Sequence, residues 1–411
     1  MRILHLVHRS WPYHGGAERY VLEHARAASA WGHRSTIATT DAWDMSWMVS
    51  RKGGHLQPGR LVHAGVEIIR FPVRHPPLQG LLRGLLRRLS PGGPDRYFYP
   101  NPFVPSLARY LAVDRGFDFV HANAMPFLLY LGHMHARRSG AGLASVPHAN
   151  VGEPYRRVSA IHYFRGAAKR VLRESSFVVA QSRFEAGLYR EMGIPPERIL
   201  TLGSGIDPEE LRGARESRRS LGLQGDVVLG LTAHCRDKGS IDLLTASREL
   251  WRRGSEHTLV LAGPLMPDMR SELRGAAGDV PPGRLVITGY LRQSDRLAWL
   301  ASCDVLALPS RLDCFGIVLL EAWALGKPVV GCYSGAMPDL VRDGSRGFVV
   351  PFGDVATLAH RLGVLLRSPG LRHGMGDRGR KAVLQRHTWK AVTDRFYARL
   401  AECGAEAEGR R

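Results

Sequence analysis

The sequence predicts two α/β domains, each built on a doubly wound, mainly parallel sheet with helices on both faces. Two observations lead to this fold class. The chain has 411 residues, too many for one ordinary core and suited to two domains of roughly 200 residues each. Short apolar or β-branched runs also alternate with amphipathic helical stretches in both halves, as parallel sheets with crossover helices require.

Ten of these runs are expected to form strands. They cover residues 2–8, 34–39, 66–71, 117–121 and 177–180 in the first half, and 226–231, 258–262, 284–288, 303–308 and 328–331 in the second. With 44% hydrophobic and 23% charged residues, the chain can bury such sheets and does not have the composition of a disordered protein.

A glycine-rich turn at residues 203–208 separates the halves, and the polar, arginine-rich stretch after it reads as a linker that reaches Ser220. We therefore expect an N-terminal domain at residues 1–205 and a C-terminal domain at residues 206–385. Residues 386–411 should form a final helix with a frayed tail, packing back toward the N-terminal domain. Its apolar face would carry Trp389, Val392, Phe396 and Leu400.

The formal net charge of +20 favours anionic partners such as phosphorylated ligands or anionic lipid surfaces. Nucleic acid is not expected, because no recognisable motif or ladder of aromatic and basic residues occurs. Five cysteines without a CxxC pair or metal-ligand spacing favour a reducing cytosol and no metal. The first apolar run is too short for a signal peptide, and no apolar run is long enough to span a bilayer, so a cytoplasmic location is expected.

Two loops that follow expected strands carry candidate phosphate ligands. Gly15 and Gly16 open a helix, whose free amides and positive end suit a diphosphate, although a plain turn explains a glycine pair equally well. Lys238 follows the strand at 226–231, and loops above parallel strands are where open α/β sheets bind ligands. Arg236 either shares this task or is an ordinary exposed arginine.

The densest signal lies between Asp313 and Glu321, which have seven residues between them. A helix that begins near Gly316 would offer its first amides to phosphate oxygens. The two carboxylates would then face one cleft and accept hydrogen bonds from sugar hydroxyls. A neighbouring arginine or the helix dipole is the alternative partner for Glu321.

Taken together, these residues resemble the large class of retaining nucleotide-sugar glycosyltransferases with the GT-B architecture, in which two Rossmann-like domains face each other across a cleft. The resemblance runs nearly end to end, and the carboxylate block is its most specific part. The matching motifs begin at Gly15, Gly32, Pro147, Val179, Gly205, Lys238, Leu261, Thr288, Leu308, Gly326 and Gly347.

The resemblance implies catalytic roles for four residues. Lys238 would neutralise the departing diphosphate, Glu321 would bind the ribose hydroxyls, and Asp313 would touch the donor sugar. His148 would face that sugar, unless it is an ordinary loop histidine among the 18 in the chain. The donor would further contact Gly15, Gly16, Arg236, Gly263, Tyr290, Phe315, Gly316, Ile317 and Val318.

The implied activity is transfer of a mannose- or glucose-type hexose from a UDP- or GDP-sugar to a glycan or lipid-linked acceptor, with retention, in cell-surface polysaccharide or glycolipid synthesis. No cofactor or metal is expected, because Lys238 and helix N-termini would stabilise the leaving group. Two departures stand against full activity: Asp313 replaces the usual glutamate, and the arginine usual before the lysine is missing, with Thr232 and Ala233 in its place. A non-catalytic sugar-nucleotide or glycan-binding protein and a nucleotide-sugar epimerase therefore remain alternatives.

A leucine face with basic flanks between Leu78 and Leu89, and a second basic group, are typical of helices that lie on an anionic membrane. The first stretch fits a helix that covers the domain's own core equally well. The second group consists of Arg165, Lys169, Arg170 and Arg173. Peripheral binding at the inner face of the plasma membrane is the corresponding expectation.

Overall fold

The structure is a computed structural model that describes residues 1–13, 15–76, 102–123, 127–149, 151–152, 167–214 and 217–408. The leucine face expected between Leu78 and Leu89, and Arg165, lie outside these residues. The chain forms two compact units. Unit 1 comprises Met1–Ala149, Tyr155–Gly203 and Val392–Arg411, and unit 2 comprises Asn150–Pro154 and Ser204–Ala391.

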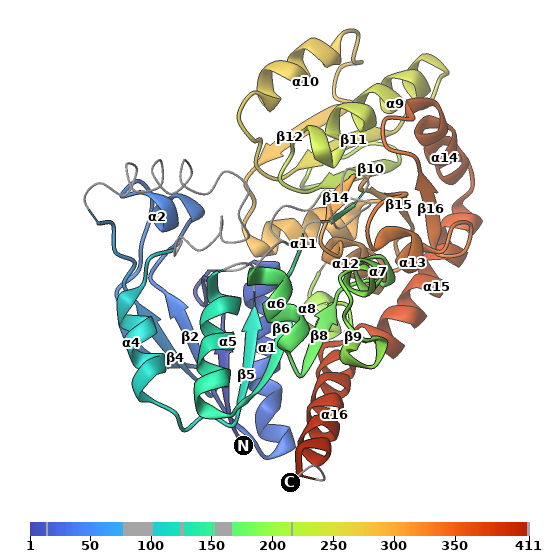
Figure 1. The fold of residues 1–411 in the computed structure, drawn as a ribbon. Helices are drawn as coiled ribbons and strands as arrows, with labels where there is room; N and C mark the ends of the chain where they lie inside the picture. The colour runs from blue at the N-terminus through green and yellow to red at the C-terminus, as the bar shows by residue number, and fades with distance from the viewer. Residues whose placement is uncertain are drawn as a thin grey trace. The chain divides into compact units, whose positions relative to one another are not determined.

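Unit 1 contains an eight-stranded sheet (Figure 1). In spatial order its strands are β3 (Gly59–His63), β4 (Val66–Phe71), β2 (Arg34–Thr40), β1 (Arg2–Leu6), β5 (Phe119–Asn123), β6 (Gly142–Val146), β8 (Phe177–Ala180) and β9 (Ile199–Thr201). All neighbours are parallel except β3 and β4. The order reverses between β1 and β5, which makes this the topological switch point of the sheet.

The helices of unit 1 are α1 (Gly16–Ala27), α2 (Met45–Val49), α4 (Pro105–Val113), α5 (Phe127–Ser139), α6 (Ala167–Glu174), α7 (Arg183–Glu191) and the part of α16 (Trp389–Glu408) that follows Ala391. The apolar face predicted for the last helix is confirmed, since Val392, Phe396 and Leu400 are buried. The ring of Phe396 packs against His24 of α1 and Phe177 of β8.

Unit 2 contains a six-stranded, wholly parallel sheet (Figure 1). Its strands in spatial order are β12 (Leu285–Gly289), β11 (Thr258–Ala262), β10 (Val227–Leu231), β13 (Val305–Ala307), β15 (Val329–Cys332) and β16 (Gly347–Val350). This order corresponds to 3-2-1-4-5-6, and its switch point lies between β10 and β13.

Strand alternation explains why helices cover both faces of this sheet. Val228 packs with helices α9 (Ser240–Arg252), α10 (Met269–Ala277) and α14 (Val355–Arg367). Its neighbour Leu229 points to the opposite face, where the core includes side chains from α8 (Pro208–Arg212), α11 (Gln293–Ser302), α12 (Ile317–Ala324), α13 (Met337–Val341) and α15 (Pro369–Arg386). The predicted doubly wound α/β fold class is confirmed.

One local prediction is wrong, and several strands were not predicted. The stretch that follows residue 206 is not a linker, because Leu211 lies in the core of unit 2 and Arg218 forms a 2.5 Å ion pair with Asp304. The stretch is polar because it forms part of the surface of unit 2, and Leu211 and Arg218 attach it to that unit. Several strands also escaped prediction, among them β6, whose sequence Gly-Leu-Ala-Ser-Val carries a single β-branched residue.

Among the described residues, no helix combines the length and the hydrophobicity that a membrane span needs.

Candidate active site

Lys238 and Asp313 meet at the switch point of unit 2. Lys238 lies in the loop after β10, and Asp313 lies in β14 (Leu312–Asp313), which follows β13. The ammonium Nζ donates to Asp313 Oδ2 at 2.8 Å and to the carbonyl of Leu312 at 2.8 Å. An ammonium has three donors, so one N–H remains for a further acceptor. The pairing brings two predicted site residues together across 75 positions of sequence.

Further contacts fix the two loops that carry this pair. Arg311 donates from its backbone amide to the carbonyl of Asp237 and from Nε to the Asp237 carboxylate, at 3.0 and 2.7 Å. Gly239 has φ +67°, and a Cβ there would lie 2.4 Å from the carbonyl oxygen of Pro309. A larger residue therefore cannot occupy position 239 without moving the second loop.

A short second strand supports Asp313 from its other side. β7 (Val151–Gly152) belongs to unit 2 and pairs antiparallel with β14, with Asp313 opposite Val151. The close approach requires Gly152, since a Cβ there would lie 2.2 Å from the Arg311 carbonyl oxygen. The backbone of Asp313 is thus held by a ladder, and its side chain by Lys238.

Helix α12 begins directly after this loop. Its N-cap is Gly316, with φ +83°, and no side chain caps the helix. Ile317 and Val318 occupy the first two helical positions, so their amides precede the intrahelical ladder. The ring of Phe315 belongs to the core of unit 2, 5% exposed, which leaves only its backbone to contact a ligand.

Glu321, on α12, already has a partner. Both of its oxygens accept from the guanidinium of Arg296, on α11, at 2.5 and 2.8 Å. The neighbouring-arginine alternative for this carboxylate is therefore realised. Each carboxylate oxygen has a second lone pair, so the bidentate pair still leaves acceptor capacity for ribose hydroxyls.

The remaining residues of unit 2 that were predicted to bind the donor differ in exposure and in contacts. Arg236 is mostly exposed and pairs with Glu272 at 2.8 Å, as an ordinary surface arginine does. Tyr290 is 82% exposed. Gly263 directly follows β11 with φ +125°, and a Cβ there would lie 2.0 Å from the Thr232 carbonyl oxygen. Gly263 is thus needed for the close packing of two loops at the carboxyl edge of the sheet.

In unit 1, Gly15 and Gly16 stand at the start of α1, as the sequence indicates. Gly15 is the N-cap, and a Cβ there would lie 2.1 Å from the Glu18 carboxylate. Glu18 occupies the first turn and is buried, but Arg9 pairs with it at 2.9 Å. This pair neutralises a carboxylate that would otherwise oppose an anion at the helix start.

His148 has a specific partner in unit 1. Its Nε2 lies 3.0 Å from Oδ1 of Asn123, at the end of β5, and its φ of +49° is unusual for a residue with a side chain. Burial lowers the pKa of His148 to about 4, so the ring is neutral near pH 7. Asn123 uses its amide group on the His121 carbonyl, which makes Nε2 of His148 the donor and Nδ1 an acceptor.

Three more buried histidines lie close to His148. The Tyr20 ring packs against both His24 and His148, and Nδ1 of His5 lies 2.9 Å from Nδ1 of His121. Burial lowers the pKa of His5 and of His24 to about 3, and that of His121 well below its ordinary value. Across the described part of the chain, no group of His, Cys, Asp and Glu side chains is arranged to hold a metal ion.

Sequence reasoning missed Arg296, Asp237 and Asn123. Arg296 is 25 positions away from Glu321 and sits on a different helix, so no local spacing links the two. Asp237 and Asn123 carried a usable signal, because each lies at or just beyond the carboxyl end of a parallel strand, where ligand-binding residues gather.

Two protein-family models match the chain, one in each half. The family model described as "Glycosyl transferases group 1" matches residues 226–368, and the model "Glycosyl transferase 4-like domain" matches residues 15–205. A GDP-mannose-dependent alpha-(1-6)-phosphatidylinositol monomannoside mannosyltransferase of Mycolicibacterium smegmatis is 30% identical over 324 residues, 75% of this chain and 82% of that protein.

Two further matches are similar in extent. An MMP alpha-(1->4)-mannosyltransferase of Mycolicibacterium hassiacum is 28% identical over 344 residues, 78% of this chain and 80% of that protein. Among solved structures, Anabaena HepE in complex with UDP and glucose superposes with a TM-score of 0.73 and 19% identity, over 98% of this chain and all of HepE. This last match concerns the fold alone.

Proposed function

Because the chain belongs to the group 1 glycosyltransferases, we propose that it transfers a hexose from a nucleotide-sugar donor to an acceptor hydroxyl with retention of anomeric configuration. The Lys238–Asp313 pair at the switch point of unit 2 is the observation that carries the proposal. The donor is a UDP- or GDP-sugar of mannose or glucose type. The mannosyltransferase relatives support this donor class.

In the proposed reaction Lys238 stabilises the leaving nucleoside diphosphate. The bond between sugar C1 and the β-phosphate oxygen breaks, and negative charge develops on that oxygen. The remaining N–H of Lys238 and the first amides of α12 supply donors for this charge, which is electrostatic stabilisation where charge develops. The acceptor oxygen bonds to C1 on the same face, and the hydroxyl proton passes to the leaving phosphate oxygen.

Glu321 is assigned to the ribose of the donor. The guanidinium of Arg296 holds both carboxylate oxygens, so the remaining lone pairs of Glu321 are oriented before the nucleotide arrives. Asp313 is assigned to the donor sugar through Oδ1, because Oδ2 is taken by Lys238. Aspartate in place of glutamate thus serves both the lysine and the sugar.

His148 is assigned to a hydroxyl of the donor sugar. Its neutral ring offers Nδ1 as an acceptor while Asn123 holds Nε2. A protonated ring at this position would instead be a donor at both nitrogens. Because burial keeps the ring neutral, Nδ1 of His148 accepts this hydrogen bond and the sugar hydroxyl donates it.

We assign the acceptor to the glycans or lipid-linked glycans of the cell surface, with peripheral attachment to an anionic membrane. On α6, Arg170 and Arg173 are exposed while Val171 and Leu172 are buried, which presents a basic face to a surface. Co-sedimentation with vesicles containing phosphatidylglycerol tests the attachment. Equal recovery with neutral and anionic vesicles would contradict it.

A thermal-shift screen with UDP-, GDP- and ADP-sugars tests the proposed function. A ligand that binds only the folded protein stabilises it by about 2.7 kcal/mol at one hundred times its Kd. One nucleotide class should raise the melting temperature, and its sugar should appear on an added acceptor. A donor that binds but yields only an isomerised nucleotide-sugar would establish an epimerase instead.

A further inference from the structure

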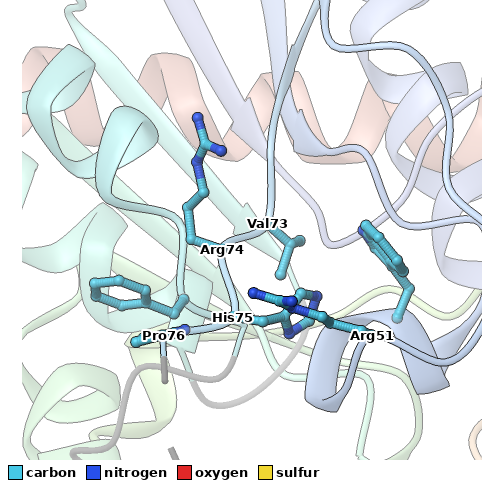
Figure 2. Close-up of a pocket in the computed structure, with 7 residues that line it drawn as sticks. Arg51, Val73, Arg74, His75 and Pro76 are labelled. Atoms are coloured by element: carbon cyan, nitrogen blue, oxygen red, sulfur yellow. The ribbon is translucent and has the colours of Figure 1, made fainter. Parts of the chain in front are cut away.

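Unit 1 contains a pocket at the carboxyl edge of its sheet, one strand away from the switch point (Figure 2). It has a volume of about 480 Å³, within the range of small-molecule sites. Trp47 lines it from α2 and Arg51 from the segment just after that helix, and residues 73–76 line it after β4. Phe103 joins them because its carbonyl accepts from the amide of Arg74 at 2.8 Å.

One buried carboxylate fixes two walls of this pocket. Oδ1 of Asp41 accepts from the indole Nε1 of Trp47 at 3.1 Å and from the amide of Val73 at 2.9 Å. Asp41 is 3% exposed and does not line the pocket itself. The aromatic wall and the segment after β4 are therefore held in place before any ligand binds.

The charge of the pocket is positive. Arg51 and Arg74 are both exposed, and within the described residues neither pairs with a carboxylate. No acidic side chain is among the seven lining residues. Two exposed guanidiniums that make no ion pair with any described carboxylate suit an anion that presents several oxygens, above all a phosphate group.

His75 adds a polar group beside Arg51 and the ring of Trp47. Neither of its ring nitrogens has a hydrogen-bond partner within the described part of the chain. Figure 2 shows the ring beside Arg51, and it packs edge-on to Trp47 with centroids 5.1 Å apart. Burial, and then the charge of Arg51, lowers the pKa of His75, which favours a neutral ring with one donor and one acceptor nitrogen. A sugar or polyol hydroxyl can satisfy both roles.

From this juxtaposition we propose that the pocket binds a polyhydroxy ring bearing a phosphate ester, with the phosphate on Arg51 and Arg74 and a ring hydroxyl on His75. The aromatic faces of Trp47 and Phe103 supply the apolar contact that a sugar ring makes. The proposal rests on the proposed function in one respect, since it assigns this ligand as the acceptor. A soluble sugar phosphate and a phosphorylated lipid headgroup share this chemistry.

Titration calorimetry on the full chain, without donor, tests the binding. Glucose 6-phosphate, mannose 6-phosphate and inositol 1-phosphate are each compared with the parent polyol, and phosphatidylinositol vesicles with neutral vesicles. At least one phosphorylated probe should bind, and R51Q and R74Q should each weaken it by about tenfold or more, because a charged hydrogen bond is lost. R34Q, which removes an equally exposed arginine at the opposite edge of the sheet, is the matched control and should bind as the wild type does.

The two ligand sources give different outcomes. Binding of a soluble probe that depends on both arginines supports a soluble acceptor, and arginine-dependent binding of vesicles alone supports a lipid headgroup. Binding by no probe, or binding that R51Q and R74Q leave unchanged, overturns the proposal. In that case, wild-type rates of donor hydrolysis by R51Q and R74Q would mean that only the pocket assignment fails, and the proposed transfer activity would be unaffected. Arginine-dependent binding without any transfer would contradict the proposed function and leave the pocket standing.

Discussion

Lys238 donates to Oδ2 of Asp313 at 2.8 Å, across the switch point at which the strand order of unit 2 reverses. In the proposed reaction, the pair supplies a cation for the diphosphate and an anion for the sugar of the nucleotide-sugar. One ammonium N–H and one carboxylate oxygen remain for these two parts of the donor.

Replacing Asp313 by Asn should change two measurements in opposite directions. The amide keeps the side-chain shape but removes a negative charge beside Lys238, so a free nucleoside diphosphate should bind roughly three- to tenfold more tightly. The transfer rate should fall, because the amide oxygen is a weaker acceptor for the sugar hydroxyl. Calorimetry with the nucleotide and an assay of transfer measure the two effects; weaker nucleotide binding would contradict the assigned roles.

Replacing Arg296 by Ala should weaken both stability and nucleotide binding. The change leaves the partly buried carboxylate of Glu321 without its partner, which costs about 0.5–3 kcal/mol on the scale of coupled pairs. KM for the donor should rise more than kcat falls, because Arg296 orients a binding group. Urea denaturation and a double-mutant cycle with Glu321→Ala check the coupling. Additive losses would show that the two residues act independently.

Replacing Gly263 by Ala should destabilise unit 2. A methyl group would collide with the Thr232 carbonyl oxygen, and φ of +125° is strained for alanine, so about 1–3 kcal/mol should be lost. Gly213 is the matched control, because its φ is −78° and no atom lies within 4 Å of the added Cβ. Chemical denaturation should separate the two variants clearly. Equal stability would mean that the loops after β10 and β11 can move apart freely.

The buried histidines should make unit 1 sensitive to acid. Burial lowers the pKa of His24 to about 3, against an ordinary value of 6.5, so the unfolded state binds more protons between these pH values. The free energy of unfolding must therefore fall as pH falls below 6.5, by about 1.4 kcal/mol per pH unit for each such group. His5 and His148 add to this slope.

The variant His24→Met tests the sign and the size of this effect. The slope of unfolding free energy against pH between 5 and 6 should decrease by about 1.4 kcal/mol per pH unit, even if the variant is less stable overall. His360, exposed on α14, provides the control variant His360→Met, which should keep the wild-type slope. A slope that His24→Met does not alter would show that this histidine is already protonated in the folded protein.

Much of the fold could be predicted because its signals are local. Ten apolar runs correspond to strands, although 117–121 lies at 119–123 and 303–308 shortens to 305–307. A buried parallel strand needs a continuous apolar run, which the sequence displays directly. The short strands β7 and β14 could not be found in this way, because their pairing depends on a close approach at Gly152.

The sequence predicted which residues belong to the candidate site better than it predicted which of them pair with one another. The loop positions of Lys238 and Asp313 followed from strand order, but their ion pair joins residues 75 positions apart and needs the folded sheet. Likewise, the apolar run around Glu321 indicated that it needs a partner, while only the packing of α11 against α12 identifies Arg296. Phe315, predicted to contact the donor, places its ring in the core of unit 2, which the sequence did not indicate.

The most direct test of the account is the rate of hexose transfer by Lys238→Ala and Glu321→Ala, measured beside the wild type with its best donor. Loss of Lys238 removes a donor to the developing charge, so kcat should fall roughly 100- to 1,000-fold, and loss of Glu321 should raise KM for the donor. Lys381→Ala, which removes an exposed lysine of α15, should leave both constants unchanged. Wild-type rates in both site variants would contradict the assignment of the active site to unit 2.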